Sequence, residues 1–255
     1  MMLVFAALAA CAASLLTFFS GFGLVTVLTP FFIVLFPVET AVLAVALVHL
    51  ANNVLKAGLV GRHVDVGVAL RFGLPAVAGS AVGAVALGWL AVGPGGWAWS
   101  WGGLEGTVRP ASAVLGAMMV AFAVLELRPP KDLGKRGLVA GGLLSGFFGG
   151  LTGHQGALRS AFLVRAGLEP KAFVATGVAI ALGVDAVRLA VYGATFKLAA
   201  LAEAWPLLAA AMGGAAVGSI AGARLLHRLT IRGLQRIVAV LLLITGIATA
   251  AGVMG

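Results

Sequence analysis

Charged residues are scarce in this sequence. They account for 10% of its 255 residues, whereas 62% are hydrophobic, and a soluble domain usually carries about 25% charged residues. The mean hydropathy of +1.13 points the same way. Several apolar runs approach or exceed the roughly 20 residues that a membrane-spanning helix needs, and a β-barrel would instead show alternating segments of about ten residues. The composition therefore predicts an all-α polytopic membrane protein whose residues 1–255 form one domain in a lipid bilayer.

Cysteine is nearly absent, and several patterns typical of enzymes are missing. Cys11 is the single cysteine, which excludes an intramolecular disulfide and a thiolate-bound metal cluster. No P-loop is present, which argues against an ATP-driven pump, and neither Ser20 nor Ser145 lies in the G-x-S-G pattern of an intramembrane serine protease. The histidines are widely scattered, at His49, His63, His154 and His227. We therefore expect no metal site, no cofactor, no catalytic residue and no enzymatic activity.

Lysine and arginine are missing from the N-terminal region. Neither occurs before Lys56, so this end does not resemble a basic signal peptide. The net charge of +9 comes from residues in short gaps between apolar segments and not from one soluble face, so we expect no nucleic-acid partner. The apolar segments are residues 2–19, 24–36, 40–60, 68–93, 108–126, 138–150, 157–164, 172–194, 204–224 and 237–253.

The basic residues concentrate in four of the gaps. By the positive-inside rule these gaps should be cytoplasmic, whereas gaps 94–107 and 194–203 and both termini should be external. Gap 94–107 also contains Trp97, Trp99 and Trp101, which suit an aromatic belt at the membrane interface. The pattern predicts a multi-pass protein of the cytoplasmic (inner) membrane. The four basic gaps are residues 61–67, 127–137, 164–171 and 224–236.

This orientation makes the stretch between gaps 127–137 and 164–171 enter and leave the membrane on one side. The stretch has about 26 residues, whereas two full spans would need about 40. It contains the glycine-rich sequence GGLTGHQG at 149–156. We expect a helical hairpin, re-entrant or made of short spans, whose broken backbone is buried in protein or lines a watery cavity. Segments 2–19 and 24–36 flank the break SGFG at 20–23 in the same way.

Each half of the chain is thus one broken hairpin followed by three spans. Because three is an odd number, the second half should have the opposite orientation in the membrane to the first. The first repeat is residues 1–126, the cytoplasmic linker 127–137 and the second repeat 138–255. Weak internal similarity supports this: NNVLKAGLVG (52–61) aligns with VDAVRLAVYG (184–193), and AVAGSAVGAVA (76–86) with AMGGAAVGSIA (211–221). Inverted repeats with broken helices are the usual build of secondary transporters, whose substrate site lies at the repeat interface.

The sequence SGFFGGLTGHQGALRSAFLVRAGLEPKAFVATG at 145–177 carries a family resemblance. A glycine-rich break, an apolar return, a short loop and a helix opening near the Thr-Gly pair at 176–177 resemble the sulfite exporter TauE/SafE family of membrane permeases. The resemblance covers nearly the whole chain. The family's commoner form has a triple glycine after the break and a proline on the return helix, where this chain has HQG at 154–156 and Ser160. The resemblance implies transport of small sulfur-containing anions, such as sulfite or sulfonates.

Polar residues at the two breaks are the first candidates for substrate contacts. Half-helix N-termini present free N–H groups and a positive dipole end, which suit an anion. The alternative is that these polar groups only satisfy one another and the loose backbone. The candidates are Ser20, Gly21, Ser145, Thr152, Gly153, His154, Gln155 and Gly156.

Basic and amide side chains outside the breaks are further candidates. Arg159 lies about one turn after the second break and could face the anion or snorkel to the interface. His49, Asn53 and Lys56 share one helix face by their spacing. Lys56 could also snorkel, whereas the deeper His49 and Asn53 should face the interior of the bundle.

Asp185 and Arg188 lie three residues apart near the middle of segment 172–194. They could form a structural ion pair, because a lone buried carboxylate is costly in a membrane. Alternatively, Arg188 contacts substrate and Asp185 carries a coupling proton, a role that His154 could also fill.

The sequence therefore predicts a secondary transporter that moves small anions across the membrane by alternating access. A cation or amino-acid exporter on a similar inverted-repeat plan and a non-transporting membrane scaffold are the alternatives. The exact substrate, the transport direction, the coupling ion and the choice between monomer and homodimer are left open.

The predicted topology can be tested with single cysteines in a Cys11→Ala background. An impermeant thiol reagent on intact cells should label Gly102→Cys, because gap 94–107 is external, and should spare Gly134→Cys. The reverse labelling would contradict the orientation. Labelling of Gly167→Cys from outside would contradict the inner hairpin alone.

Overall fold

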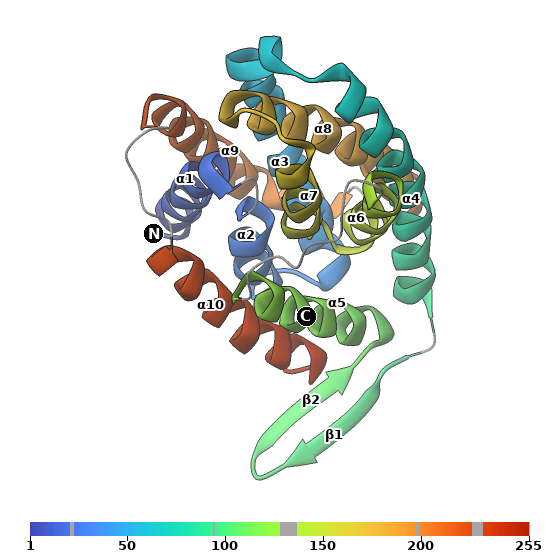
Figure 1. The fold of residues 1–255 in the computed structure, drawn as a ribbon. Coiled ribbons are helices and arrows are strands. Elements are labelled where there is room, and N and C mark those ends of the chain that lie inside the picture. The colour runs from blue at the N-terminus through green and yellow to red at the C-terminus, as the bar shows by residue number, and fades with distance from the viewer. Residues whose placement is uncertain (21–22, 94, 128–136, 197–198, 226–231, 255) are drawn as a thin grey trace.

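The computed structural model describes residues 1–20, 23–93, 95–127, 137–196, 199–225 and 232–254, with backbone alone for some helix residues beside the gaps. Within these residues the chain forms a bundle of ten α-helices and one β-hairpin (Figure 1). The helices are α1 (Met2–Ser20), α2 (Leu24–Ile33), α3 (Val38–Val60), α4 (Val66–Val92), α5 (Pro110–Leu127), α6 (Leu138–Thr152), α7 (Gly156–Leu163), α8 (Pro170–Thr195), α9 (Ala199–Leu225) and α10 (Arg232–Ala250).

Each predicted apolar segment corresponds to one of these helices, so the prediction of a helical polytopic membrane protein is confirmed. Four helices of the described residues are long and apolar enough to cross a membrane: Val38–His63, Val66–Val92, Pro170–Thr195 and Leu201–Arg224. Shorter apolar helices accompany them, among them α2 and α6, and α7 is shorter still. At 1.5 Å per residue, α7 is only about 12 Å long, less than half of a roughly 30 Å hydrocarbon core.

Glycine ends or begins the helices at both predicted breaks. Gly153 caps α6 with φ +84°, and Gly23 precedes α2 with φ +134°. Other residues rarely adopt these positive values, so glycine is what permits the chain to turn here. Figure 1 shows the returning helices α2 and α7 near the centre of the bundle.

The first helix of each hairpin packs closely on a long helix of the other half. On the contact between α6 and α4, a Cβ at Gly142, Gly146 or Gly150 would collide with backbone carbonyls of α4. A Cβ at Gly79 or Gly83 of α4 would collide with α6 in the same way. Lipid supplies no hydrophobic drive for helix association, so close backbone approach through small residues holds such helices together.

Helices α1 and α9 make the corresponding contact. A Cβ at Gly214 or Gly218 of α9 would meet the carbonyl oxygens of Ala7 or Cys11 of α1. These two glycines align with Gly79 and Gly83 in the internal similarity noted above, 76–86 with 211–221. Helix α5 packs on α10, and α3 packs on α8.

A β-hairpin between α4 and α5 departs from the all-α prediction. Strands β1 (Trp97–Trp101) and β2 (Leu104–Val108) pair antiparallel around Gly102 and Gly103. Both glycines have positive φ, as a two-residue hairpin turn with the favoured twist requires. The segment was interpreted only as an aromatic belt, although its alternating tryptophans also suit a strand.

Two sets of contacts fix which gaps lie at the same end of the bundle. Trp99 Nε1 donates to the Ala251 carbonyl at 2.7 Å, so the hairpin lies beside the C-terminal end of α10. The Asp65 N–H donates to Thr176 Oγ1 at 3.0 Å, so gap 61–67 lies beside the start of α8. This grouping agrees with the predicted topology, and which end faces the cytoplasm stays a prediction.

Close helix packing predicts the effect of adding one methyl group. Gly146→Ala should lower the free energy of unfolding by about 1–3 kcal/mol, because the new Cβ meets the backbone of α4. Gly58→Ala is the matched control on α3, since a Cβ there meets nothing within 4 Å. Thermal unfolding in detergent measures both, and equal melting temperatures for the two variants would contradict the packing argument.

Candidate functional site

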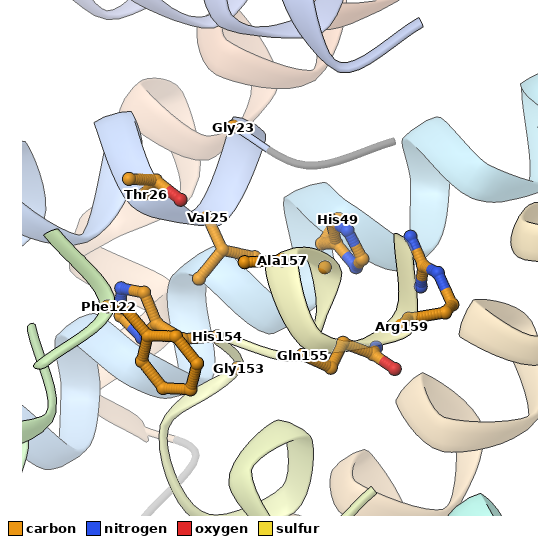
Figure 2. Close-up of a pocket in the computed structure, with 11 residues that line it drawn as sticks. Gly23, Val25, Thr26, His49, Phe122, Gly153, His154, Gln155, Ala157 and Arg159 are labelled. Atoms are coloured by element: carbon orange, nitrogen blue, oxygen red, sulfur yellow. The ribbon is translucent and has the colours of Figure 1, made fainter. Parts of the chain in front are cut away.

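A pocket lies between the two breaks, where α2 and α7 both begin (Figure 2). The first turn of α2 lines one wall and residues 153–157 line another. His49 from α3, Phe122 from α5 and Arg159 from α7 complete the lining. The first N–H groups of a helix have no partner within the helix and carry a positive dipole end. Both half-helices therefore direct positive ends at one pocket.

A second pocket adjoins the first and shares His49 and Arg159 with it. Asn53 and Lys56 of α3 line it, together with Ser160 of α7, Thr17 of α1 and the first turns of α8. His49 and Arg159 thus stand between two pockets that are both polar.

Buried basic residues outnumber buried acidic ones at this place. Lys56, Arg159 and Arg188 are 2%, 5% and 0% exposed. Asp185, at 0%, is the only buried carboxylate among the described side chains. Because Lys56 and Arg159 lie inside the bundle, neither snorkels to the interface. The site therefore has an excess of positive charge.

Asp185 joins the two halves of the chain. The Asp185 carboxylate lies 2.9 Å from Arg188 Nη2, as the spacing of three residues predicted. Its other oxygen accepts from Asn53 Nδ2 at 2.9 Å and lies 2.6 Å from His49 Nδ1. Arg188 in turn donates to the Gly149 carbonyl at 3.4 Å near the end of α6. A network of side chains thus connects α3, α8 and the second break.

At the second break, some polar side chains form hydrogen bonds to the backbone. Ser145 Oγ donates to the Gln155 carbonyl at 3.1 Å, and Thr152 Oγ1 donates to the Phe148 carbonyl at 3.2 Å. Thr152 Oγ1 also lies 3.2 Å from His154 Nδ1. For Ser145 and Thr152, the structure favours the alternative that polar groups at the break satisfy the local backbone.

The remaining polar atoms of the break are available to a ligand. His154 Nε2 and both amide atoms of Gln155 are buried without a hydrogen-bond partner. Figure 2 shows the His154 ring beside Phe122, and the two rings stack with centroids 5.8 Å apart and planes 13° apart. Buried polar atoms are nearly always paired, so these atoms mark a place where a ligand or water belongs.

The predicted residues separate into a lining and a supporting set. Ser145, Thr152, Asp185 and Arg188 line neither pocket and lie behind the lining residues. Gly21 lies outside the described residues, and Ser20 ends α1 with only its backbone described. The predicted residues that line the pockets are Asn53, Lys56, Gly153, His154, Gln155, Gly156 and Arg159.

Other residues of the site were not among the predicted contacts. His49 was placed on the interior face of its helix but was not expected to line both pockets. Thr26 follows the first break by about one turn, and this position in the sequence could have identified it as a pocket residue. Nothing in the sequence distinguishes Phe122 from the many other apolar residues of α5. Tyr192, four residues after Arg188, donates its hydroxyl to the Gly150 carbonyl.

One known protein family matches this chain over most of its length. Residues 6–249 match the profile of the family described as sulfite exporter TauE/SafE. The chain belongs to the TauE/SafE family. No curated protein and no solved structure gives a significant match. The resemblance seen in 145–177 is thereby confirmed over nearly the whole chain.

Membership of the TauE/SafE family indicates the general activity of the protein. TauE/SafE proteins are membrane transporters of sulfite-type anions and are not enzymes. The family suggests a small anion as the class of substrate.

The Asp185 network predicts a stability effect. Asp185→Asn should lower the free energy of unfolding by about 3–5 kcal/mol, because it leaves the buried Arg188 charge without its counter-ion. The double variant Asp185→Asn/Arg188→Gln should recover most of this loss. Thermal unfolding in detergent measures both, with Glu203→Gln on the exposed side of α9 as control. A double variant as unstable as Asp185→Asn would contradict the ion-pair argument.

Proposed function

We propose that this chain is a secondary transporter that moves small sulfur-containing anions, such as sulfite or sulfonates, by alternating access. One observation carries the proposal. The N-termini of two half-helices and the buried side chains of Lys56 and Arg159 line the pockets. Behind them lie Arg188 and Asp185, the one buried carboxylate among the described side chains.

The electrostatics favour an anion over a cation. Buried positive charge is costly in a membrane, and a bound anion offsets that cost. A cation would add to it, which argues against the alternative of a cation exporter. An amino acid would bring an ammonium group into the same positive field. The polar atoms of the site therefore fit a compact oxyanion best.

The donors at the site suit the oxygens of a sulfur oxyanion. Free N–H groups of α2 and α7, the Gln155 amide and the guanidinium of Arg159 can each donate to an oxygen. Glycine at 153 and 156 lets the backbone approach the ligand closely. The first pocket is thus the proposed substrate site, and Lys56 and Asn53 lie on the path to it through the second pocket.

The helix pairing supports two inverted repeats, residues 1–126 and 138–255 joined by the linker 127–137. The contact of α6 with α4 is repeated by α1 with α9, as a twofold relation between the halves requires. Asn53 and Asp185 are equivalent in the aligned stretches and are hydrogen-bonded to each other. Equivalent residues touch in this way only near the axis that relates two repeats.

This arrangement supports alternating access as the proposed mechanism. The pockets lie where the two halves meet, so a rocking of one half against the other would open the site to each side in turn. We place the protein in the inner membrane with the basic gaps in the cytoplasm.

The proposed substrate class can be tested in proteoliposomes with sulfite, sulfate, thiosulfate, sulfoacetate and taurine. Flux of at least one sulfur-containing anion is expected. Gln155→Ala should weaken its binding by about 10-fold to 100-fold, because one hydrogen bond to a charged ligand contributes about 1.5–3 kcal/mol.

Calorimetry in detergent measures the affinity of the wild-type protein and of Gln155→Ala for the transported anion. His63→Ala is the control, since His63 lies in the turn after α3 and lines neither pocket. Cation uptake without anion flux would contradict the proposed function. Unchanged affinity in Gln155→Ala would place the substrate elsewhere.

A further inference from the structure

Among the residues that the structure describes, His49 is the one that both lines the two pockets and contacts Asp185. It lines both pockets, is 6% exposed and lies 2.6 Å from the Asp185 carboxylate. His49 belongs to the first half of the chain and Asp185 to the second. The contact therefore spans the interface that must rearrange if the halves move.

The partners of Asp185 determine which nitrogen of His49 carries hydrogen. His49 Nδ1 lies 2.6 Å from the Asp185 carboxylate and 3.1 Å from Asn53 Nδ2. An ionised carboxylate only accepts hydrogen bonds, so the tautomer that fits it carries hydrogen on Nδ1, and Asn53 Nδ2 then donates to the same carboxylate. The other ring nitrogen, Nε2, is then the one that can gain or lose a proton. In this arrangement Asp185 orients the ring and stabilises its charged form.

The charges around His49 make that proton sensitive to an anion. The Asp185 carboxylate lies 2.6 Å from the ring, and the buried cationic side chains of Arg188 on α8, Arg159 on α7 and Lys56 on the same helix lie at the same site. An anion bound in either pocket offsets part of the positive field. Proton and anion should therefore bind cooperatively, and each must strengthen the other by the same factor.

We propose that His49, held by Asp185, carries the coupling proton of transport, an inference that rests on the proposed function. As the anion enters, Nε2 takes one proton from the solution on that side and becomes imidazolium. When the site opens to the other side, the anion leaves and Nε2 releases the proton there. One proton and one anion move in the same direction, and no covalent bond to the substrate forms or breaks.

The other two candidates fit this role less well. His154 lines the first pocket, but it contacts the Thr152 hydroxyl and stacks on the Phe122 ring, and neither group is a carboxylate that would stabilise an imidazolium as Asp185 does at His49. Asp185 is enclosed by three donors and lines neither pocket. Asp185 is thus a positioning residue, and His49 is the group that meets both pockets.

The test compares three asparagine variants: His49→Asn, His154→Asn and His63→Asn. Asparagine places an amide donor near the position of Nδ1, so His49→Asn keeps a donor for Asp185 and removes the titrating nitrogen. The probes are thiosulfate and methanesulfonate, because neither changes its charge between about pH 5 and 8, where histidine normally titrates.

Wild-type protein should bind the probe more weakly as the pH rises, by up to about tenfold per pH unit above the titration of His49. His49→Asn should bind with a flat pH dependence, exchange labelled probe across proteoliposomes, and lose accumulation driven by a pH gradient. His154→Asn and His63→Asn should keep the pH dependence. Loss of the pH dependence in His154→Asn, with its retention in His49→Asn, would overturn the proposal.

A measurement on wild-type protein covers the case in which His49→Asn does not fold. Calorimetry in buffers of different ionisation enthalpy should show uptake of up to one proton per probe bound. Binding without proton uptake across this pH range would overturn the role of His49 while leaving the anion site intact. Absence of binding and flux for every sulfur-containing anion would instead reject the proposed function itself.

Discussion

A carboxylate buried in a membrane protein must be surrounded by donors, and the candidate site is organised around this requirement at Asp185. Asn53 and His49 on α3 and Arg188 on α8 supply the donors. Arg188 also reaches the Gly149 carbonyl, and the Tyr192 hydroxyl donates to the Gly150 carbonyl. Both carbonyls belong to the last turn of α6, where helices leave backbone oxygens without intrahelical partners. The Gly149 carbonyl also accepts from the capping N–H of Gly153 at 2.9 Å. One ionic cluster therefore joins the two halves and also completes the end of the broken helix that forms the pocket.

A second constraint is that lipid competes for the apolar faces of the helices, so the helices need another means of association. Glycine provides it by allowing close contact between helix backbones. The contacts of α6 with α4 and of α1 with α9 bring backbones so close that a single methyl group would collide. Close packing of this kind fixes the first helix of each hairpin against the opposite half. The returning helices α2 and α7 are then positioned by what surrounds them, because eight or ten residues form too short a helix to be stable alone. Their N-termini are held at the pocket by tertiary packing and not by their own propensity.

Much of this fold could be predicted because its signals are local. Length and hydropathy locate the helices, glycine clusters locate both breaks, and a spacing of three residues pairs Asp185 with Arg188. Contacts between distant segments could not be predicted in this way. His49 and Asp185 are 136 residues apart in sequence, and the stacking of Phe122 on His154 follows from how α5 passes the second break. The β-hairpin was missed for a different reason, since tryptophans in a short external gap suit an interfacial belt as well as a strand.

The balance of donors and acceptors limits what the site can hold. Lys56 and Arg159 carry only donors, and the free N–H groups of two helix starts add more. The Asp185 carboxylate, the one buried carboxylate among the described side chains, is already engaged by three donors. A ligand with several acceptor atoms and negative charge would complement these groups, and the proposed sulfur oxyanion has both whereas a cation has neither. A protonated His49 increases this preference further, so the occupancy of the pocket and the charge of the ring depend on each other. Anion selectivity and proton coupling would then arise from the same cluster of charges at the interface of the two halves.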